Sequence, residues 1–181
     1  MGVQFVEMSI DEVCEKIKNM SDRKLTARIL NTFIDNGLTY KVKEAYGCHE
    51  DINRDMYRIY CYVKKSKETM IINTKGYAGI EHGGEFVIQL RITNPMILEN
   101  IGLYTKNIRS IFLNGRDCML PNCYDCKKWY RFHYNDKNYQ KCGMLCSNFN
   151  FLNLSENDHD DLVSIVNEEI RFCKPKRKTK A

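Results

Sequence analysis

Apolar residues recur every three or four positions in the first part of the chain. The spacing predicts a helix over residues 10–36, with a break near residues 19–22. Ser9 and Glu12 have the spacing of a capping box at its start. Asn36-Gly37 is a typical C-terminal stop signal, so the helical region is expected to end there.

The pattern then changes to a period of two. Between residues 56 and 64 the apolar odd-numbered positions alternate with more polar ones, which indicates a strand with one buried face. Residues 38–42 and 86–92 are also predicted to be extended, and residues 69–72 are expected to return as a hairpin partner. Together these segments predict an antiparallel sheet of about four strands.

Two further helices are expected in the second half of the chain. Asn94-Pro95 opens one of them, and Asn114-Gly115 ends it. Ser155 caps the last helix, whose early acidic residues suit the positive end of its dipole rather than a metal cluster. The fold class predicted from this order is α+β, with N-terminal helices, the sheet, a helix, a hairpin and a C-terminal helix.

Composition supports one globular domain. The chain has 181 residues, of which 43% are hydrophobic and 11% aromatic, too many for a disordered chain. No apolar run approaches the roughly 18 residues of a membrane span, and residues 1–8 lack the features of a secretory signal. We therefore expect a cytoplasmic protein that is not embedded in a membrane, with residues 1–173 forming a single domain.

The net charge of +5 comes from the C-terminus. Five of the 28 basic residues lie in residues 174–181, and residues 1–173 have 23 bases and 23 acids. Residues 174–181 are therefore predicted to be a disordered basic tail, in which Lys176, Arg177 and Lys178 could contact phosphates. A solvated terminus that only keeps the protein soluble is the alternative.

The nine cysteines are unevenly distributed. An odd number without a signal peptide argues against a disulfide framework and for a reducing compartment. Cys14 and Cys61 lie on apolar sides of predicted elements and are most simply core residues. Five of the nine fall within residues 118–146, which we interpret as a cysteine-rich insertion in the domain.

Four of these five cysteines have the spacing of a zinc ribbon. Cys123 and Cys126 are separated by two residues, fifteen residues follow, and Cys142 and Cys146 form the second pair. Two ligand-bearing turns joined by a hairpin can bind one zinc ion through four thiolates. Cys118 is the alternative to Cys146, because the second pair is separated by three residues instead of two.

The sequence is also compatible with another ligand and with another metal. His133 lies within the predicted hairpin of residues 129–142 and could replace one cysteine. Cys118, Cys123 and Cys126 also match the plant-type ferredoxin spacing, so an iron–sulfur cluster is the alternative to zinc. The bulky residues between Cys118 and Cys123 argue against a cluster. A closed site of four thiolates has no open position for a substrate, which argues against an enzyme without excluding one.

The cysteine segment resembles part of other proteins. The stretch from Cys123 through Cys126 and Cys142 to Phe149, with the helix that follows, is similar to the C-terminal part of small uncharacterised bacterial proteins with a ribbon-like four-cysteine site. The resemblance covers about 50 residues and carries no named family. It implies no activity, and it favours a bacterial cytosolic origin.

A second candidate site lies on the predicted sheet. Arg58, Tyr60, Tyr62 and Lys64 occupy the more polar positions of one strand, and Arg91 those of another. Aromatic stacking combined with cationic contacts is typical of single-strand binding, and the same face could border a small-ligand pocket or pack against a helix. The sequence thus predicts a non-catalytic, zinc-stabilised protein that binds a small ligand or a protein partner. Its alternative is a zinc-ribbon-type nucleic-acid-binding protein.

Overall fold

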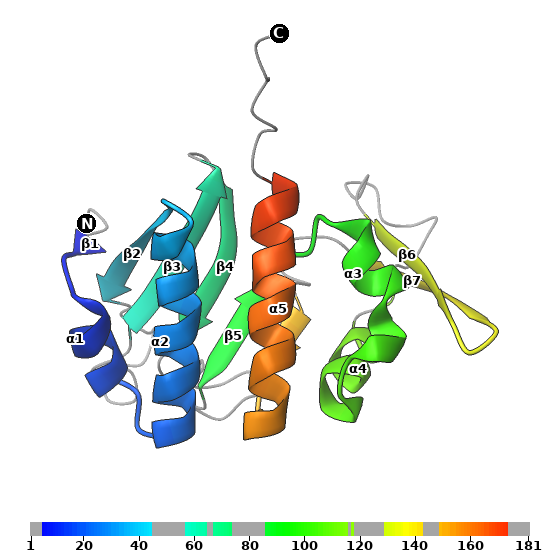
Figure 1. The fold of residues 1–181 in the computed structure, drawn as a ribbon, viewed down its shortest axis with the longest axis horizontal. Coiled ribbons are helices and arrows are strands. Elements are labelled where there is room, and N and C mark those ends of the chain that lie inside the picture. Colours follow the sequence, from blue (N-terminus) through cyan, green and yellow to red (C-terminus); the bar gives the residue numbers. More distant parts are fainter. Residues whose placement is uncertain are drawn as a thin grey trace, which may run out of the picture.

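The computed structural model describes residues 5–44, 57–64, 67–73, 86–115, 117, 129–142 and 149–173. In this part of the chain an antiparallel sheet is covered on one face by two long helices, while a second group of short helices and a hairpin lies to one side (Figure 1). The α+β fold class predicted from the sequence is confirmed.

The first helical region is divided in two. Helix α1 spans Ile10–Glu15 and α2 spans Met20–Asp35. The capping box predicted at Ser9 and Glu12 is present, and the backbone N–H of Ser9 donates to the Glu12 carboxylate at 2.7 Å. The break occurs because Asn19 caps α2, and its side-chain oxygen accepts from the N–H of Ser21 at 2.7 Å. Helix α2 ends at the predicted stop.

The main sheet has six strands instead of the four expected. They are β1 (Phe5–Val6), β2 (Thr39–Glu44), β3 (Tyr57–Lys64), β4 (Lys67–Asn73), β5 (Val87–Leu90) and β8 (Phe149–Phe151), in the order β1-β2-β3-β4-β5-β8 with every pair antiparallel. The two strands that the sequence pattern missed are the short edge strands β1 and β8. Two or three residues are too few to show a period.

One face of this sheet forms the hydrophobic core. Val42, Ile59 and Cys61 alternate with outward-facing residues along β2 and β3, and all three are buried. Helix α2 packs against β2, and α5 (Glu156–Cys173) packs against both α2 and β3. The two helices lie side by side over the sheet and cover these apolar side chains (Figure 1).

The single continuous helix predicted between residues 94 and 115 is wrong. The chain forms α3 (Pro95–Glu99), a short 3₁₀ turn (Ile101–Leu103) and α4 (Lys106–Leu113). Thr105 is the cause of the second break. Its side chain caps α4, while its backbone N–H donates to Asp161 at 2.5 Å and its hydroxyl donates to Asp158 at 2.6 Å.

Carboxylates of α5 hold the segment containing α3 and α4 against the core. Glu169 is fully buried and accepts from the backbone N–H groups of Thr93 and Asn94, each at 2.9 Å. Burial works to raise the pKa of Asp158, but hydrogen bonds from Asn107, Thr105 and Ser155 bring it below its ordinary value. These acids therefore fix the packing of α5 against the segment that precedes and contains α3 and α4.

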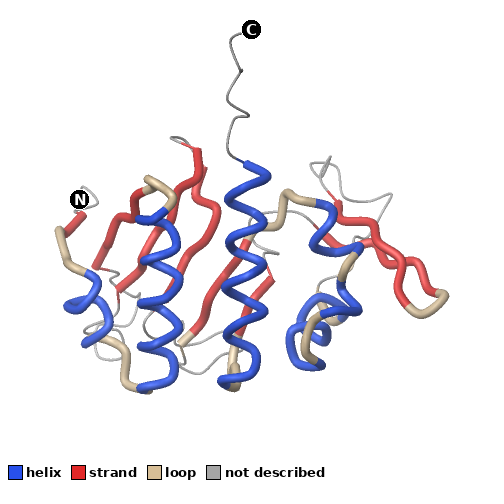
Figure 2. Tube along the Cα trace, viewed as in Figure 1, coloured by secondary structure: helices blue, strands red, loops and turns tan. Residues whose placement is uncertain are grey.

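A separate hairpin follows the cysteine-rich segment. Strands β6 (Trp129–Tyr134) and β7 (Lys137–Cys142) pair antiparallel and project away from the main sheet (Figure 2). The predicted hairpin of residues 129–142 is therefore confirmed, and its turn consists of two residues. Asn135 and Asp136 both have positive φ, 47° and 58°, which is the backbone of a type I′ turn.

No helix in the described ranges is both long enough and apolar enough to cross a lipid bilayer. Residues 45–56, 74–85, 118–128 and 143–148 and the basic tail lie outside the described residues.

Candidate functional site

Cations and aromatic rings share the face of the main sheet that is opposite α2 and α5. We call the outward-facing residues of β1, β2 and β3 that carry them the cationic-aromatic surface: Phe5, Lys41, Lys43, Arg58, Tyr60 and Tyr62. Their common face follows from the register, which pairs Phe5 with Lys43, Lys43 with Arg58, and Lys41 with Tyr60.

Four of these side chains are linked by contacts with aromatic rings. The Lys41 amino group lies 5.2 Å from the centre of the Phe5 ring and 5.9 Å from that of Tyr62, both within cation–π range. Phe5 and Tyr60 meet edge to face, with ring centres 6.5 Å apart. One lysine therefore links rings that come from β1 and β3.

The surface is accessible and carries one sign of charge. Phe5 is 48% exposed, Lys41 is exposed, and Tyr60 and Tyr62 are half-buried. Among the outward positions of β1–β3 whose side chains are described, none is acidic. Glu68 of β4, the register partner of Tyr62, is an acidic position at the border of the surface. Half-exposed rings beside basic side chains favour a planar, negatively charged partner.

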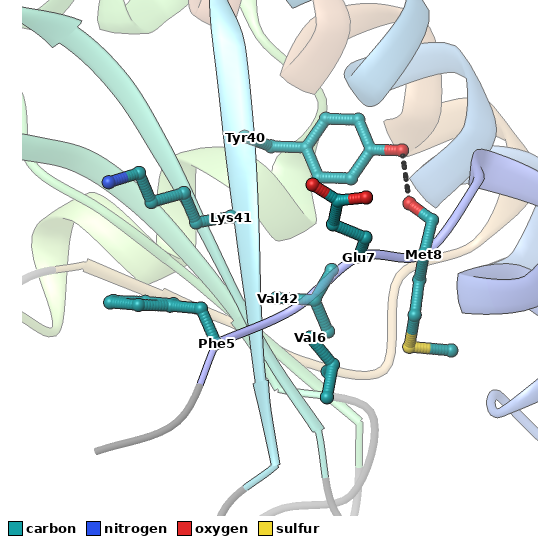
Figure 3. A pocket seen from close by; sticks show the side chains of 7 residues that line it. All are labelled: Phe5, Val6, Glu7, Met8, Tyr40, Lys41 and Val42. Carbon is teal, nitrogen blue, oxygen red and sulfur yellow. Dashed lines mark hydrogen bonds between the residues drawn. The ribbon is translucent and has the colours of Figure 1, made fainter. Parts of the chain in front are cut away.

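A pocket lies at the edge of the same surface. Residues 5–8 and 40–42 line a volume of about 390 Å³ between β1 and β2. Figure 3 shows Phe5 and Lys41 on one side of β2, and Tyr40 with Met8 on the other. The Tyr40 hydroxyl donates to the Met8 carbonyl at 2.9 Å, and burial raises the pKa of that hydroxyl. The pocket is of the size found in small-ligand sites.

Three of the five sheet residues predicted from the sequence come together. Arg58, Tyr60 and Tyr62 all belong to the cationic-aromatic surface. Lys64 is the last residue of β3, and its side chain lies outside the described part of the structure. Arg91 follows β5 and is separated from β3 by β4. Arg91 instead lies near Tyr130 of the hairpin. Burial raises the pKa of Tyr130 to about 12, and the positive charge of Arg91 partly opposes this shift.

Sequence reasoning missed the contributions of β1 and β2. Lys41 and Lys43 alternate with Tyr40 and Val42, so the same period of two that identified β3 could have placed both lysines on the outward face. Phe5 offered no such signal, because β1 has only two residues. Lys176, Arg177 and Lys178 lie in the basic tail, outside the described residues, and their role stays a prediction.

The predicted metal ligands are mostly outside the described residues. This holds for Cys118, Cys123, Cys126 and Cys146, so the metal site and the choice between zinc and an iron–sulfur cluster stay predictions. Within the ranges that are described, no group of three or more His, Cys, Asp or Glu side chains could hold a metal ion.

Cys142 can be compared with a cysteine of the core. Cys61 is part of the main hydrophobic cluster, as predicted. Cys142 is only 7% exposed but lies outside that cluster, at the open end of the hairpin. The alternation of β6 and β7 places it on the face of exposed Arg131 and His133, opposite the core-facing Phe132. Packing against the main core therefore does not account for its burial.

One expectation about this segment is wrong. His133 pairs with Asn138 beside the turn, four register positions and about 13 Å from Cys142, so the two cannot share one ion. On the other face of the hairpin, the Lys141 amino group contacts the Asp117 carboxylate at 2.6 Å and lies 5.6 Å from the centre of the Tyr139 ring.

A serine–histidine contact between α2 and α5 does not form an active site. The Ser21 hydroxyl oxygen lies 3.5 Å from Nε2 of His159, beyond the usual distance for an activated nucleophile. His159 is only 3% exposed, so a substrate has no access to the pair.

Comparisons with protein-family models, curated proteins and solved structures found no match to this chain. The resemblance of residues 123–149 to bacterial proteins stays a prediction. Function is therefore inferred from the geometry of the cationic-aromatic surface and from the chemistry of the cysteine segment.

Proposed function

We propose that this chain is a non-catalytic cytoplasmic binding protein. Its six-stranded sheet presents the cationic-aromatic surface to an anionic partner, and a zinc ion stabilises the cysteine-rich segment. The observation that carries the proposal is the convergence of three basic side chains and three aromatic rings from β1, β2 and β3 on one face of the sheet.

The surface suits a partner that is both charged and planar. Lysine and arginine attract anions over about 8–10 Å at physiological salt, and this attraction increases the rate of encounter. The rings add contact area and stack on planar groups at short range. A small anionic ligand in the β1–β2 pocket, an acidic segment of a protein and a nucleic-acid strand all have at least part of this chemistry.

The pocket is the specific observation in favour of a small ligand. Lys41 and Phe5 belong both to the pocket and to the cationic-aromatic surface, so an anion could pair with Lys41 while an adjacent ring contacts Phe5. A ligand of this kind would occupy the β1–β2 edge of the surface.

Zinc at the cysteine segment is supported by the hairpin register and by Cys142. Trp129 pairs with Cys142. Cys126 precedes Trp129 by only three residues, so at most about 11 Å of chain separates Cys126 from Trp129. Cys146 is four residues beyond Cys142, and Cys123 is three before Cys126. Chain length therefore permits the four sulfurs to reach one centre, with Cys118 as the alternative to Cys146. When bound there, the ion would be structural.

The proposed binding activity can be tested with two matched triple variants. Lys41→Gln/Lys43→Gln/Arg58→Gln removes three charges from the surface, and Lys176→Gln/Arg177→Gln/Lys178→Gln removes the same residue types from the tail. Both change the net charge equally. On a heparin column we expect the surface variant to elute at clearly lower salt than the tail variant. The same elution salt for the surface variant and the unmodified protein would overturn the proposal.

The zinc proposal has its own experiment. Elemental analysis of protein purified without added metal should find about one zinc per chain, and the visible absorption spectrum should be flat. Cys123→Ser/Cys126→Ser should lose the metal, whereas Cys61→Ser, in the core, should keep it. Visible absorption with bound iron would indicate an iron–sulfur cluster, and an absence of any metal would contradict both.

A further inference from the structure

We infer that the cationic-aromatic surface binds an unpaired strand of nucleic acid. The inference rests on the proposed function, the binding of an anionic partner at this surface, and it specifies the chemical class of that partner. It uses the placement of the rings relative to the cations, which an anion alone would not require.

The spacing of the two tyrosines fits separated bases. Tyr60 and Tyr62 lie two residues apart on one face of β3, which corresponds to about 6.6 Å along the strand. Bases in a duplex are stacked about 3.4 Å apart and hide their faces from a protein. Rings at this separation can instead each take one base of an unstacked strand, as single-strand-binding sheets do.

The cations lie where the phosphates of such a strand would run. Lys41 is the direct cross-strand partner of Tyr60, and Lys43 is that of Arg58, so each pair is separated by about 5 Å across the sheet. A base stacked on Tyr60 therefore has a lysine beside it on β2. Phe5, which meets Tyr60 edge to face and lies on the far side of Lys43, extends the apolar platform to the edge strand.

The dimensions of the surface distinguish a strand from smaller or flatter partners. It covers three strands, about 10 Å, and the five residues from Arg58 to Tyr62, about 13 Å along β3. Two or three nucleotides fit this area. An acidic peptide would use the cations but leave the faces of Phe5, Tyr60 and Tyr62 unused, and a duplex would offer phosphates without base faces.

The test compares strands of equal length with and without bases, together with a duplex. Fluorescence anisotropy would measure the binding of labelled 15-mers of thymidine, of uridine and of abasic deoxyribose, together with a DNA duplex, to the full-length protein at low salt. We expect the strands with bases to bind at least tenfold more tightly than the abasic strand, which has the same phosphates, and more tightly than the duplex.

Variants assign the effect to the surface. Tyr60→Leu and Tyr62→Leu should each weaken binding of the thymidine strand about tenfold and leave the abasic strand unchanged. Tyr139→Leu, the same substitution on the hairpin, should change neither. With three cations at the surface, the Lys41/Lys43/Arg58→Gln variant should reduce the slope of log affinity against log salt by about 2. Circular dichroism verifies folding, and the comparison of strands needs no variant.

The outcomes separate the two proposals. Equal affinity for the thymidine, uridine and abasic strands, or tighter binding of the duplex, would overturn the inference. If the surface variant still shifted elution from heparin, the proposed function would stand. If no strand bound and the surface variant eluted like the unmodified protein, both would fail. A preference between uridine and thymidine, together with tighter binding than the abasic strand, would support the inference.

Discussion

The two faces of the main sheet are built from alternate residues of the same strands but have different roles. On β3, Ile59 and Cys61 point to the helices and are completely buried, whereas Arg58, Tyr60 and Tyr62 point to the opposite face. Hydrophobic burial under α2 and α5 stabilises the fold. Residues of the opposite face do not belong to this core, so they can contact a partner without a large effect on stability. Stability and binding should therefore separate residue by residue along β3.

The strongest test of this separation uses two neighbours on β3. Ile59→Ala should lower the free energy of unfolding by about 4 kcal/mol, because it removes a fully buried side chain from a packed core. Tyr60→Leu should cost less than about 1 kcal/mol, because Tyr60 is only half-buried and faces away from the helices. Urea denaturation measures both. Similar losses for the two variants would show that the faces are not separate.

A second substitution extends the comparison to the helix that covers the core. Glu169→Leu should destabilise the protein by about 3 kcal/mol, since it leaves the backbone N–H groups of Thr93 and buried Asn94 without their carboxylate acceptor. Glu169→Gln, which retains one acceptor oxygen, should cost less. Neither variant should alter the salt at which the folded protein leaves a heparin column. A change in that elution would contradict the assignment of binding to the opposite face.

Acidification should destabilise the protein through His159 of α5, on the helix-covered side of the sheet. Burial lowers the pKa of His159 and Arg28 adds to this, against the opposing charges of Glu156, Asp158 and Asp160. The unfolded chain then binds more protons, so stability should be full above the ordinary histidine pKa of about 6.5 and fall as the pH decreases to 5. Urea denaturation should show a smaller loss for His159→Gln. An equal loss for His159→Gln and the unmodified protein would assign the effect to other groups.

The smallest expected effect lies in the hairpin, away from both faces. Asp136 has a left-handed backbone with φ of 58° at the second position of a type I′ turn, where glycine is preferred. Asp136→Gly should stabilise the hairpin by up to about 1 kcal/mol. The thermal midpoint should rise slightly, with no change in binding to anions. A lower midpoint would indicate that the Asp136 side chain makes a contact that stabilises the turn.

Prediction from the sequence succeeded where a local signal was long enough. The capping box at Ser9, the stop at Asn36-Gly37 and the alternation along β3 all describe the structure. The continuous helix over residues 94–115 failed because its interruption at Thr105 depends on Asp158 and Asp161, which lie more than 50 residues away in the sequence. Local periodicity contains no information about such a partner.

The candidate surface was predicted only in part for the same reason. Arg58, Tyr60 and Tyr62 share one strand, so their common face followed from a period of two. Their neighbours Lys41 and Phe5 come from other strands, and the register that joins them depends on pairing across the sheet. Arg91 was grouped with them by residue type, but β4 separates it from β3.

The central claim is that the partner binds to the outward face of β1–β3, and nuclear magnetic resonance tests it most directly. Amide shifts of ¹⁵N-labelled protein would be followed while a thymidine 15-mer is added. The largest changes should cluster at Phe5, in residues 39–43 and in residues 58–62, with small changes in α2 and α5. Changes confined to residues 174–181, or centred on the hairpin of residues 129–142, would contradict the account.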